Sequence, residues 1–235
     1  MAGYWEPIPM RRPDLLVGLD LGQSVDYTGL VVVDRVQHDR ALPASYDVQA
    51  IQRLPLGTSY PAVVAHVAAV IKALRETGPQ PTITLIADYT GCGRPVADML
   101  VDADLSALGA QLTLITITGA DSVVRVGSGE FRVPKRDLAS AILVLLQSKR
   151  IRFAEGLSLV EELTKELKGF RVKITLNGHD SYGAGEDWRS APHDDLVLAL
   201  AMACWYGETV SGAGWDSMGY SGGDLIDFFR EAGVG

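Results

Sequence analysis

The chain has 235 residues, a formal net charge of −8 and 47% hydrophobic residues. This length suffices for one large domain with a buried core, and the apolar content excludes wholesale disorder. Two cysteines, Cys92 and Cys204, cannot build a disulfide framework, so a reducing compartment is expected. The sequence has neither a signal-peptide core nor an uninterrupted apolar run of about 18 residues, so we expect a soluble cytosolic protein with no membrane partner.

The first part of the chain predicts three strands followed by a helix. Residues 15–21 and 29–36 are rich in β-branched side chains and are separated by a turn that contains glycine, which favours a hairpin. A third strand is expected at 47–54. A helix is expected at 61–78, because proline favours the first turn of a helix and a Gly-Pro pair favours its end.

The rest of the chain alternates between helices and strands. The expected elements are a strand at 82–88, a helix at 95–107, a strand at 111–118, a helix at 135–148, a short strand at 151–154, a helix at 158–168, a strand at 170–176 and a helix at 193–206. This order predicts an α/β fold: a mixed sheet with three antiparallel strands and then parallel strands, flanked by helices on both faces. The expected domains are an N-terminal extension at 1–13, a folded domain at 14–208 and a flexible glycine-rich tail at 209–235.

Four carboxylates stand where chemistry could occur. Asp20 interrupts an apolar strand, Asp88 ends the next candidate parallel strand, and Asp194 and Asp195 begin a strongly apolar helix. Open α/β sheets bind ligands at the carboxyl ends of their strands, and clustered acids repel one another unless cations neutralise them. Because Mg²⁺ and Mn²⁺ prefer carboxylate oxygens, the set is suited to two-metal phosphodiester hydrolysis.

Each of these acids also has a structural explanation. Asp20 could accept a hydrogen bond from a loop, and Asp88 could cap the helix that begins near residue 95. Asp194 and Asp195 could satisfy the first-turn amides of their helix. His193 could be a ligand or a proton shuttle, although a polar residue at a helix start is the commoner case. Cysteine and histidine spacing does not predict a zinc site.

Two other motifs point to different classes of protein. Gly91-Cys92-Gly93 follows a strand as in dinucleotide-binding loops, but the third glycine and the later acid of that pattern are absent. The segment LLVGLDLGQS is similar to the first phosphate loop of actin-like ATPases. Those proteins need two large lobes, so 235 residues leave room only for an actin-like ATPase fragment.

Four motifs, in order, resemble the nuclease domain of tailed-phage terminase large subunits. They are GLDLG, IADYTGCGRPVADML, VPKRDLASAILVLLQSKRIRF and HDDLVLALAMA, and the resemblance covers residues 14–208. That family has a ribonuclease H-like fold related to RuvC-type Holliday-junction resolvases. It cuts concatemeric viral DNA during genome packaging, with Mg²⁺ or Mn²⁺ as cofactor.

The resemblance assigns roles to individual residues. It implies that Asp20 and Asp88 are metal ligands, that Asp195 is the acid of the last helix, and that Asp194 is an additional ligand, the four together holding two ions. Lys135 matches the Pro-Lys position that precedes a basic helix. Residues 177–192 correspond to the hairpin region that borders the cleft in this family.

A basic segment supplies the candidate DNA contacts. Residues 121–175 hold eleven basic and seven acidic side chains, a local charge of +4 in an acidic chain. Because charges are screened over about 8 Å, local charge decides whether a polyanion binds, although some cations could pair with helix neighbours instead. The expected DNA-binding residues are Arg125, Lys135, Arg136, Lys149 and Arg150.

The resemblance also implies partners and a location. The partners would be double-stranded DNA and, in a packaging machine, an ATPase, the small terminase subunit or the portal; the location would be the cytoplasm of an infected bacterial host. No Walker-type motif is present, so we do not expect ATP-driven translocation by this chain. Two further hypotheses are a stand-alone RuvC-like Holliday-junction resolvase and a non-catalytic packaging or assembly module.

Overall fold

The structure is a computed structural model that describes residues 11–22, 26–39, 41–78, 80–91, 94–169 and 194–211. Several sequence predictions lie outside these ranges: the first ten residues of the extension, the strand at 170–176, the hairpin region at 177–192, His193 and the tail from residue 212 onward.

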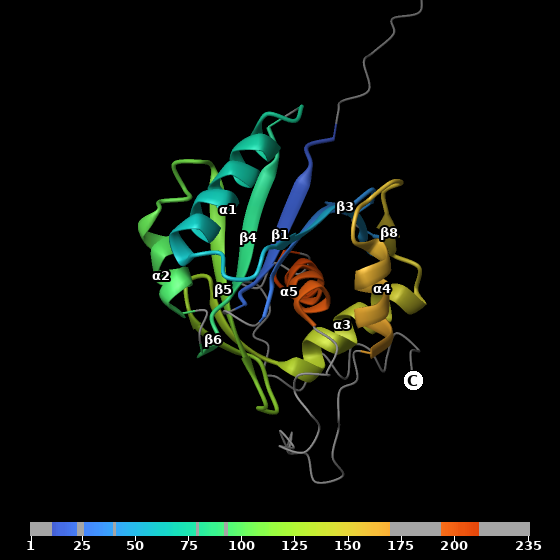
Figure 1. The fold of residues 1–235 in the computed structure, drawn as a ribbon. Helices are drawn as coiled ribbons and strands as arrows, with labels where there is room; N and C mark the ends of the chain where they lie inside the picture. The colour runs from blue at the N-terminus through green and yellow to red at the C-terminus, as the bar shows by residue number, and fades with distance from the viewer. Residues whose placement is uncertain are drawn as a thin grey trace, which may run out of the picture.

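One mixed sheet forms the centre of the described domain (Figure 1). Its strands are β1 (Asp14–Asp20), β2 (Thr28–Val36), β3 (Ser45–Leu54), β4 (Thr82–Asp88), β5 (Ala110–Thr118), β6 (Val124–Gly127), β7 (Glu130–Pro134) and β8 (Ile151–Phe153), in the spatial order β6-β7-β5-β4-β1-β2-β3-β8. The first three strands pair antiparallel, and β1, β4, β5 and β7 pair parallel. The predicted mixed sheet is confirmed.

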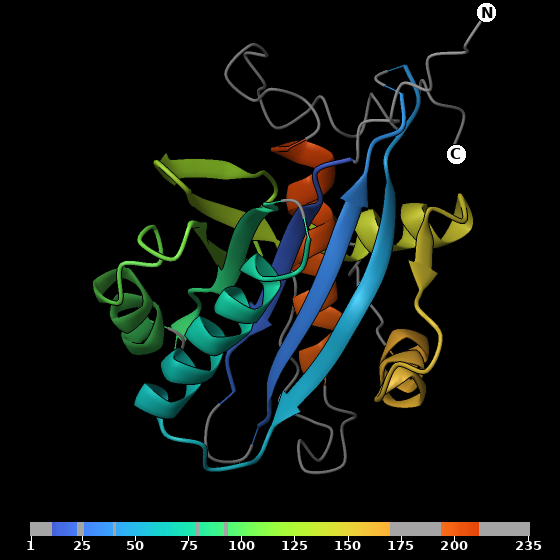
Figure 2. The same ribbon diagram turned by 90° about the horizontal axis from the view of Figure 1, so that it is seen from above.

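Helices cover both faces of the sheet (Figures 1 and 2). One face carries α1 (Tyr60–Arg75) and α2 (Arg94–Asp102), and the other carries α3 (Lys135–Gln147), α4 (Val160–Gly169) and α5 (Asp195–Thr209). The apolar sides of the strands therefore enclose two cores, one on each face. Within the described ranges, no helix is both long and apolar enough to cross a membrane.

One predicted helix needs correction, and one hairpin is absent from the predictions. The helix expected at 95–107 ends at Asp102, because the chain turns through Asp104, whose φ of 46° is left-handed. The hairpin of β6 and β7 was not predicted. All four side chains of β6 are exposed, so that strand shows none of the apolar alternation by which a half-buried strand is recognised.

The position of α5 on the sheet depends on glycine. The helix is buried over most of its length and packs across β1 and β2. A Cβ atom added to Gly18 would lie 1.9 Å from the carbonyl oxygen of Ala199, so only glycine lets the helix backbone approach β1 this closely. This close contact brings the start of α5 to the edge of the sheet where β1 ends.

Candidate active site

Asp20 and Asp88 end two neighbouring strands at the same edge of the sheet. β1 and β4 are parallel and place Leu19 opposite Ala87, so the residues that follow are neighbours as well. Adjacent strands lie about 4.8 Å apart. The two carboxylates singled out in the sequence therefore meet at the carboxyl ends of β1 and β4.

The turn after β4 holds the Asp88 side chain. Its Oδ1 accepts a hydrogen bond of 2.8 Å from the Thr90 amide, and the Thr90 hydroxyl accepts one of 2.8 Å from the Ile117 amide of β5. Burial raises the pKa of Asp88 to about 6, although the hydrogen bonds with Thr90 lower it. This oxygen thus binds the turn that follows β4. The structural explanation had suggested instead that Asp88 caps the helix near residue 95.

A glycine on β2 brings the start of α5 next to Asp20. Asp20 pairs with Gly29 in the antiparallel register of β1 and β2. A Cβ atom on Gly29 would lie 2.7 Å from the Asp195 carbonyl oxygen and 3.2 Å from its Oδ2. Since no side chain would fit there, the close approach of Asp195 to the end of β1 depends on this glycine.

Both burial and neighbouring acids disfavour the charged form of Asp20. Burial raises its pKa well above the usual value, and the charges of Asp88, Asp194 and Asp195 raise it further. The charge of Lys135 acts in the opposite direction. Asp88, Asp194 and Asp195 therefore all lie within electrostatic range of Asp20, and this repulsion favours a bound cation.

Asp195 is paired with an arginine that sequence reasoning missed. Arg53, on β3, donates from Nε to Asp195 Oδ2 at 2.8 Å and from Nη2 to Oδ1 at 3.0 Å. Its Nη2 also contacts Oε1 of Glu166, and its guanidinium lies over the Tyr27 ring, 4.8 Å from the centroid. Asp195 is only 4% exposed, so this bidentate pair neutralises a buried carboxylate.

Glu166, from α4, caps the helix that Asp194 begins. Its Oε2 accepts hydrogen bonds from the amides of Leu196 at 3.0 Å and Val197 at 2.9 Å. Asp194 is the N-cap residue of α5 but makes no side-chain capping bond. Burial raises the pKa of Glu166 to about 7, while the two amides lower it. The explanation that the Asp194 side chain satisfies first-turn amides is therefore wrong, since Glu166 accepts those of Leu196 and Val197.

Lys135 joins the site from α3. It is the first residue of that helix, directly after β7, and its Nζ lies 2.9 Å from Asp194 Oδ2. The Pro-Lys position predicted to contact DNA is thus placed beside the acids. Asp194 is 46% exposed, so this pair lies near the surface, in contrast to the buried pair of Arg53 and Asp195.

The donor chemistry of the site fits a hard divalent cation. Asp20 and Asp88 present carboxylates on neighbouring strand ends, and the raised pKa of each reflects negative charge that burial leaves poorly solvated. Asp195 and Asp194 already have basic partners. In the described ranges, no group of three or more His, Cys, Asp or Glu side chains is arranged to hold a metal ion. Asp20 and Asp88 would therefore be the first ligands of an ion.

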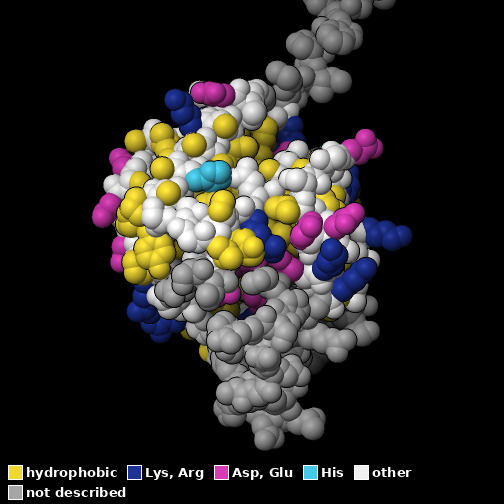
Figure 3. Space-filling view, in the orientation of Figure 1, with side chains coloured by type: hydrophobic (Ala, Val, Ile, Leu, Met, Phe, Trp, Pro, Cys, Tyr) yellow, Lys and Arg dark blue, Asp and Glu magenta, His cyan; other side chains and the backbone are white. Residues whose placement is uncertain are grey.

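The other predicted DNA-binding residues are spread over the domain. Arg136 pairs with Asp121 at 3.0 Å, beside Lys135 at the start of α3. Lys149, which is exposed, and Arg150 follow the far end of α3, a 13-residue helix about 20 Å long. Arg150 donates to both oxygens of Glu208 near the end of α5. In Figure 3, basic and acidic side chains are likewise interspersed on the visible face.

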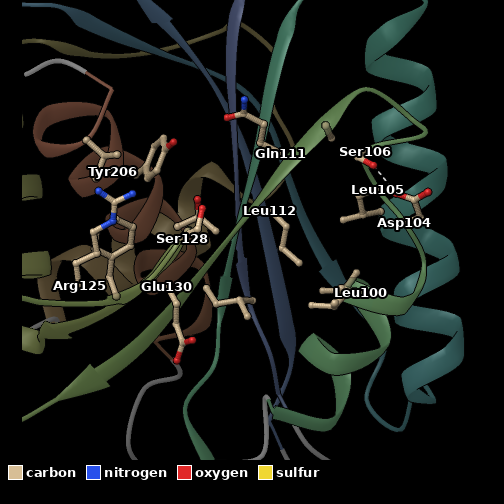
Figure 4. A pocket seen from close by; sticks show the side chains of 17 residues that line it. Leu100, Asp104, Leu105, Ser106, Gln111, Leu112, Arg125, Ser128, Glu130 and Tyr206 are labelled. Carbon is tan, nitrogen blue, oxygen red and sulfur yellow. Dashed lines mark hydrogen bonds between the residues drawn. The ribbon is translucent and has the colours of Figure 1, made fainter. Parts of the chain in front are cut away.

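A separate cavity lies at the opposite edge of the sheet (Figure 4). It has a volume of about 610 Å³ and is lined by the beginning of β5, including Leu112, and by Leu105, Tyr206 and Arg125. The acids follow the carboxyl ends of strands parallel to β5, so this cavity is not part of their site. Arg125, on β6, is separated from Asp88 on β4 by the two intervening strands β7 and β5.

Solved structures with a similar architecture include terminase nuclease domains. The human cytomegalovirus terminase nuclease domain aligns with a TM-score of 0.53 and 13% identity over 83% of both chains. A manganese-soaked structure of that domain aligns with a TM-score of 0.52 and 13% identity over 86% of both chains. The large terminase nuclease of the thermophilic phage G20c is 23% identical over 83% of this chain and 82% of that one, with a TM-score of 0.49. No protein-family model matches the chain, and no curated protein matches it in sequence.

The alignment with the cytomegalovirus domain extends over most of both chains, so it concerns the whole sheet with the helices on both faces. At such low identity the likeness establishes the fold. The chain has the ribonuclease H-like fold of the terminase nuclease domains, as the order of its sequence motifs implied.

Proposed function

We propose that the protein is a DNA endonuclease of the terminase type, which hydrolyses phosphodiester bonds with bound Mg²⁺ or Mn²⁺. The observation that carries the proposal is the meeting of Asp20, Asp88 and Asp195 at one edge of a terminase-nuclease fold. The cytomegalovirus domain of the same fold was soaked with manganese, which supports the choice of ion.

The residues of the site have separable roles in this proposal. Asp20 and Asp88 would hold the cation, with Asp195 and Asp194 completing the set for two ions. The ions, when bound, supply Lewis-acid stabilisation of the charge that develops on the phosphate. Lys135, which pairs with Asp194 at the start of α3, would attract a phosphate to the site. Contacts of this kind orient a duplex without reading its sequence.

The wider biological role follows from the sequence motifs. We propose that the substrate is concatemeric viral DNA in the cytoplasm of an infected bacterium. A packaging ATPase, the small terminase subunit and the portal are the proposed partners. Binding of the purified protein to each of these partners, measured separately, tests this part of the proposal.

The activity is tested by nicking of supercoiled plasmid with Mn²⁺. We expect the wild-type protein to nick or linearise the plasmid and Asp20→Asn to lose at least about 100-fold in rate, because one carboxylate ligand is removed. The matched control is Asp14→Asn, which changes a partly buried acid at the other end of the same strand and should cleave normally. Equal cleavage by the wild type and Asp20→Asn would contradict the proposal.

Comparing the cleavage of a four-way junction with that of a linear duplex distinguishes a terminase-type nuclease from a junction resolvase. We expect the duplex to be cut at least as well as the junction. Preferential and symmetric cutting of the junction would favour the resolvase while leaving the metal-dependent chemistry in place.

A further inference from the structure

Arg53 and Glu166 form a buried ionic network around Asp195. Arg53 contacts both oxygens of Asp195 and one oxygen of Glu166 from a single guanidinium group, with the Tyr27 ring stacked on it. The side chains of Asp195 and Glu166 are 5% exposed each. A planar fork that meets two oxygens at once fixes the plane of a carboxylate as well as its position.

Glu166 is engaged through both of its oxygens. One contacts Arg53, and the other accepts the amides of Leu196 and Val197 in the first turn of α5. A single carboxylate thereby links β3, α4 and α5 at the point where Asp195 begins its helix. Removing any member of such a buried set leaves the others unsatisfied.

We propose that Arg53 and Glu166 are positioning residues, which set the orientation of the Asp195 carboxylate toward a cation held by Asp20 and Asp88. The inference rests on the proposed function. Arg53 aligns the carboxylate directly, whereas Glu166 acts through Arg53 and through the start of α5. Partners of metal ligands typically change metal affinity or activity by 10- to 100-fold when they are removed.

The loss of Arg53 has two opposing effects on cation binding. Removing the positive charge that contacts Asp195 and Glu166 makes the site more negative, so long-range electrostatics alone predict tighter binding of Mn²⁺. Releasing the Asp195 carboxylate from its fixed orientation predicts weaker binding. The sign of the change therefore distinguishes a positioning role from a merely electrostatic one.

The experiment measures Mn²⁺ binding from the loss of the electron paramagnetic resonance signal of the free ion, together with plasmid nicking. The variants are Arg53→Gln, Arg53→Lys and Glu166→Gln, each checked for folding by circular dichroism. The matched control is Arg35→Gln. Arg35 is comparably buried and donates to the Gly207 carbonyl at the other end of α5, at 3.0 Å.

We expect Arg53→Gln and Glu166→Gln to bind Mn²⁺ roughly 10-fold more weakly and to nick more slowly. Arg53→Lys should recover part of the affinity, because an ammonium group can meet one acid but not all three oxygens. Arg35→Gln should bind Mn²⁺ like the wild type, even where the variant unfolds more easily. If Arg53→Gln does not fold, Arg53→Lys gives the decision, because lysine keeps the positive charge and loses the bidentate contact with Asp195.

Two outcomes would overturn the inference, and they differ in what else they overturn. If the wild type binds Mn²⁺ and nicks DNA, but the folded variants bind the ion equally or more tightly and nick at the wild-type rate, only the positioning role fails. If the wild type binds no Mn²⁺, the proposed function fails and the positioning role fails with it.

Discussion

Glu166 takes the place that Asp194 leaves unused at the start of α5. Asp194 is the N-cap residue, yet the amides of the first turn are satisfied by Glu166 from another helix. Capping by a distant carboxylate leaves both acids of the pair at 194–195 available for basic side chains or a cation. The first turn of α5 therefore keeps its hydrogen bonds while Asp194 and Asp195 remain available to the site.

This division of labour predicts unequal effects on stability. Glu166→Ala should lower the free energy of unfolding by about 2–4 kcal/mol, because two buried amides and Arg53 lose their partner. Asp194→Ala should cost less than about 1 kcal/mol, since its ion pair is half-exposed. Urea denaturation of the two variants measures the difference. Equal losses would contradict the assignment of the cap to Glu166.

The buried Asp88 predicts a pH dependence of stability in the absence of metal. Its pKa is about 6 in the folded protein and 3.8 in its ordinary state, so the folded protein binds the proton more tightly. This contribution to stability is complete below pH 3.8 and is lost as the pH rises through 6. Asp88→Asn keeps an oxygen for the Thr90 amide and removes the charge.

With a chelator present at pH 8, we expect Asp88→Asn to be more stable than the wild type, by up to about 3 kcal/mol. The advantage should shrink at pH 5, where the wild-type carboxyl is largely protonated. Urea unfolding at the two pH values measures it. A variant less stable than the wild type at pH 8 would show that the charge is compensated in the folded protein.

Gly18 should tolerate no side chain. Gly18→Ala would place a Cβ atom 1.9 Å from the Ala199 carbonyl, so α5 would have to move away from β1 at a cost of about 3 kcal/mol or more. Gly127, on the edge strand β6, has nothing near its added Cβ, and Gly127→Ala is the control, with an effect below about 1 kcal/mol. Thermal unfolding of both variants gives the comparison, and similar melting temperatures would be inconsistent with the close packing of α5.

The placement of the basic residues predicts unequal contributions to DNA binding. Lys135→Gln should weaken binding and reduce the salt slope by about one, because Lys135 lies beside the acids where a phosphate would be cut. Arg125→Gln should have a smaller effect, since β7 and β5 separate Arg125 on β6 from Asp88 on β4. Fluorescence anisotropy with duplex DNA at two salt concentrations tests both. An equal loss for the two variants would mean that DNA is bound over the whole domain.

Much of the fold could be predicted because it is encoded locally. Period-two and period-3.6 apolar patterns gave the strands and helices, and the order of elements gave the mixed sheet. The hairpin of β6 and β7 could not be found, because an exposed edge strand carries no apolar alternation. Asp20 and Asp88 were visible as charges within or at the end of apolar strands.

Only the tertiary structure reveals Arg53 and Glu166 as parts of the site. Glu166 lies in the run EELTKELK, which in sequence is typical of a solvated helix, and Arg53 is one polar residue near the end of a strand. They are separated by 113 residues, and Arg53 and Asp195 by 142. No local pattern records contacts over such distances.

The sequence by itself predicted most of the strands, the order of the helices and the four candidate acids, because these depend on neighbours along the chain. The tertiary structure decided which acid is paired, which helix end is capped and which basic residues reach the site. Those outcomes depend on how closely α5 packs on β1 and β2, which Gly18 and Gly29 allow. A buried charge is stabilised by whichever partner the packing brings to it, wherever that partner lies in the sequence.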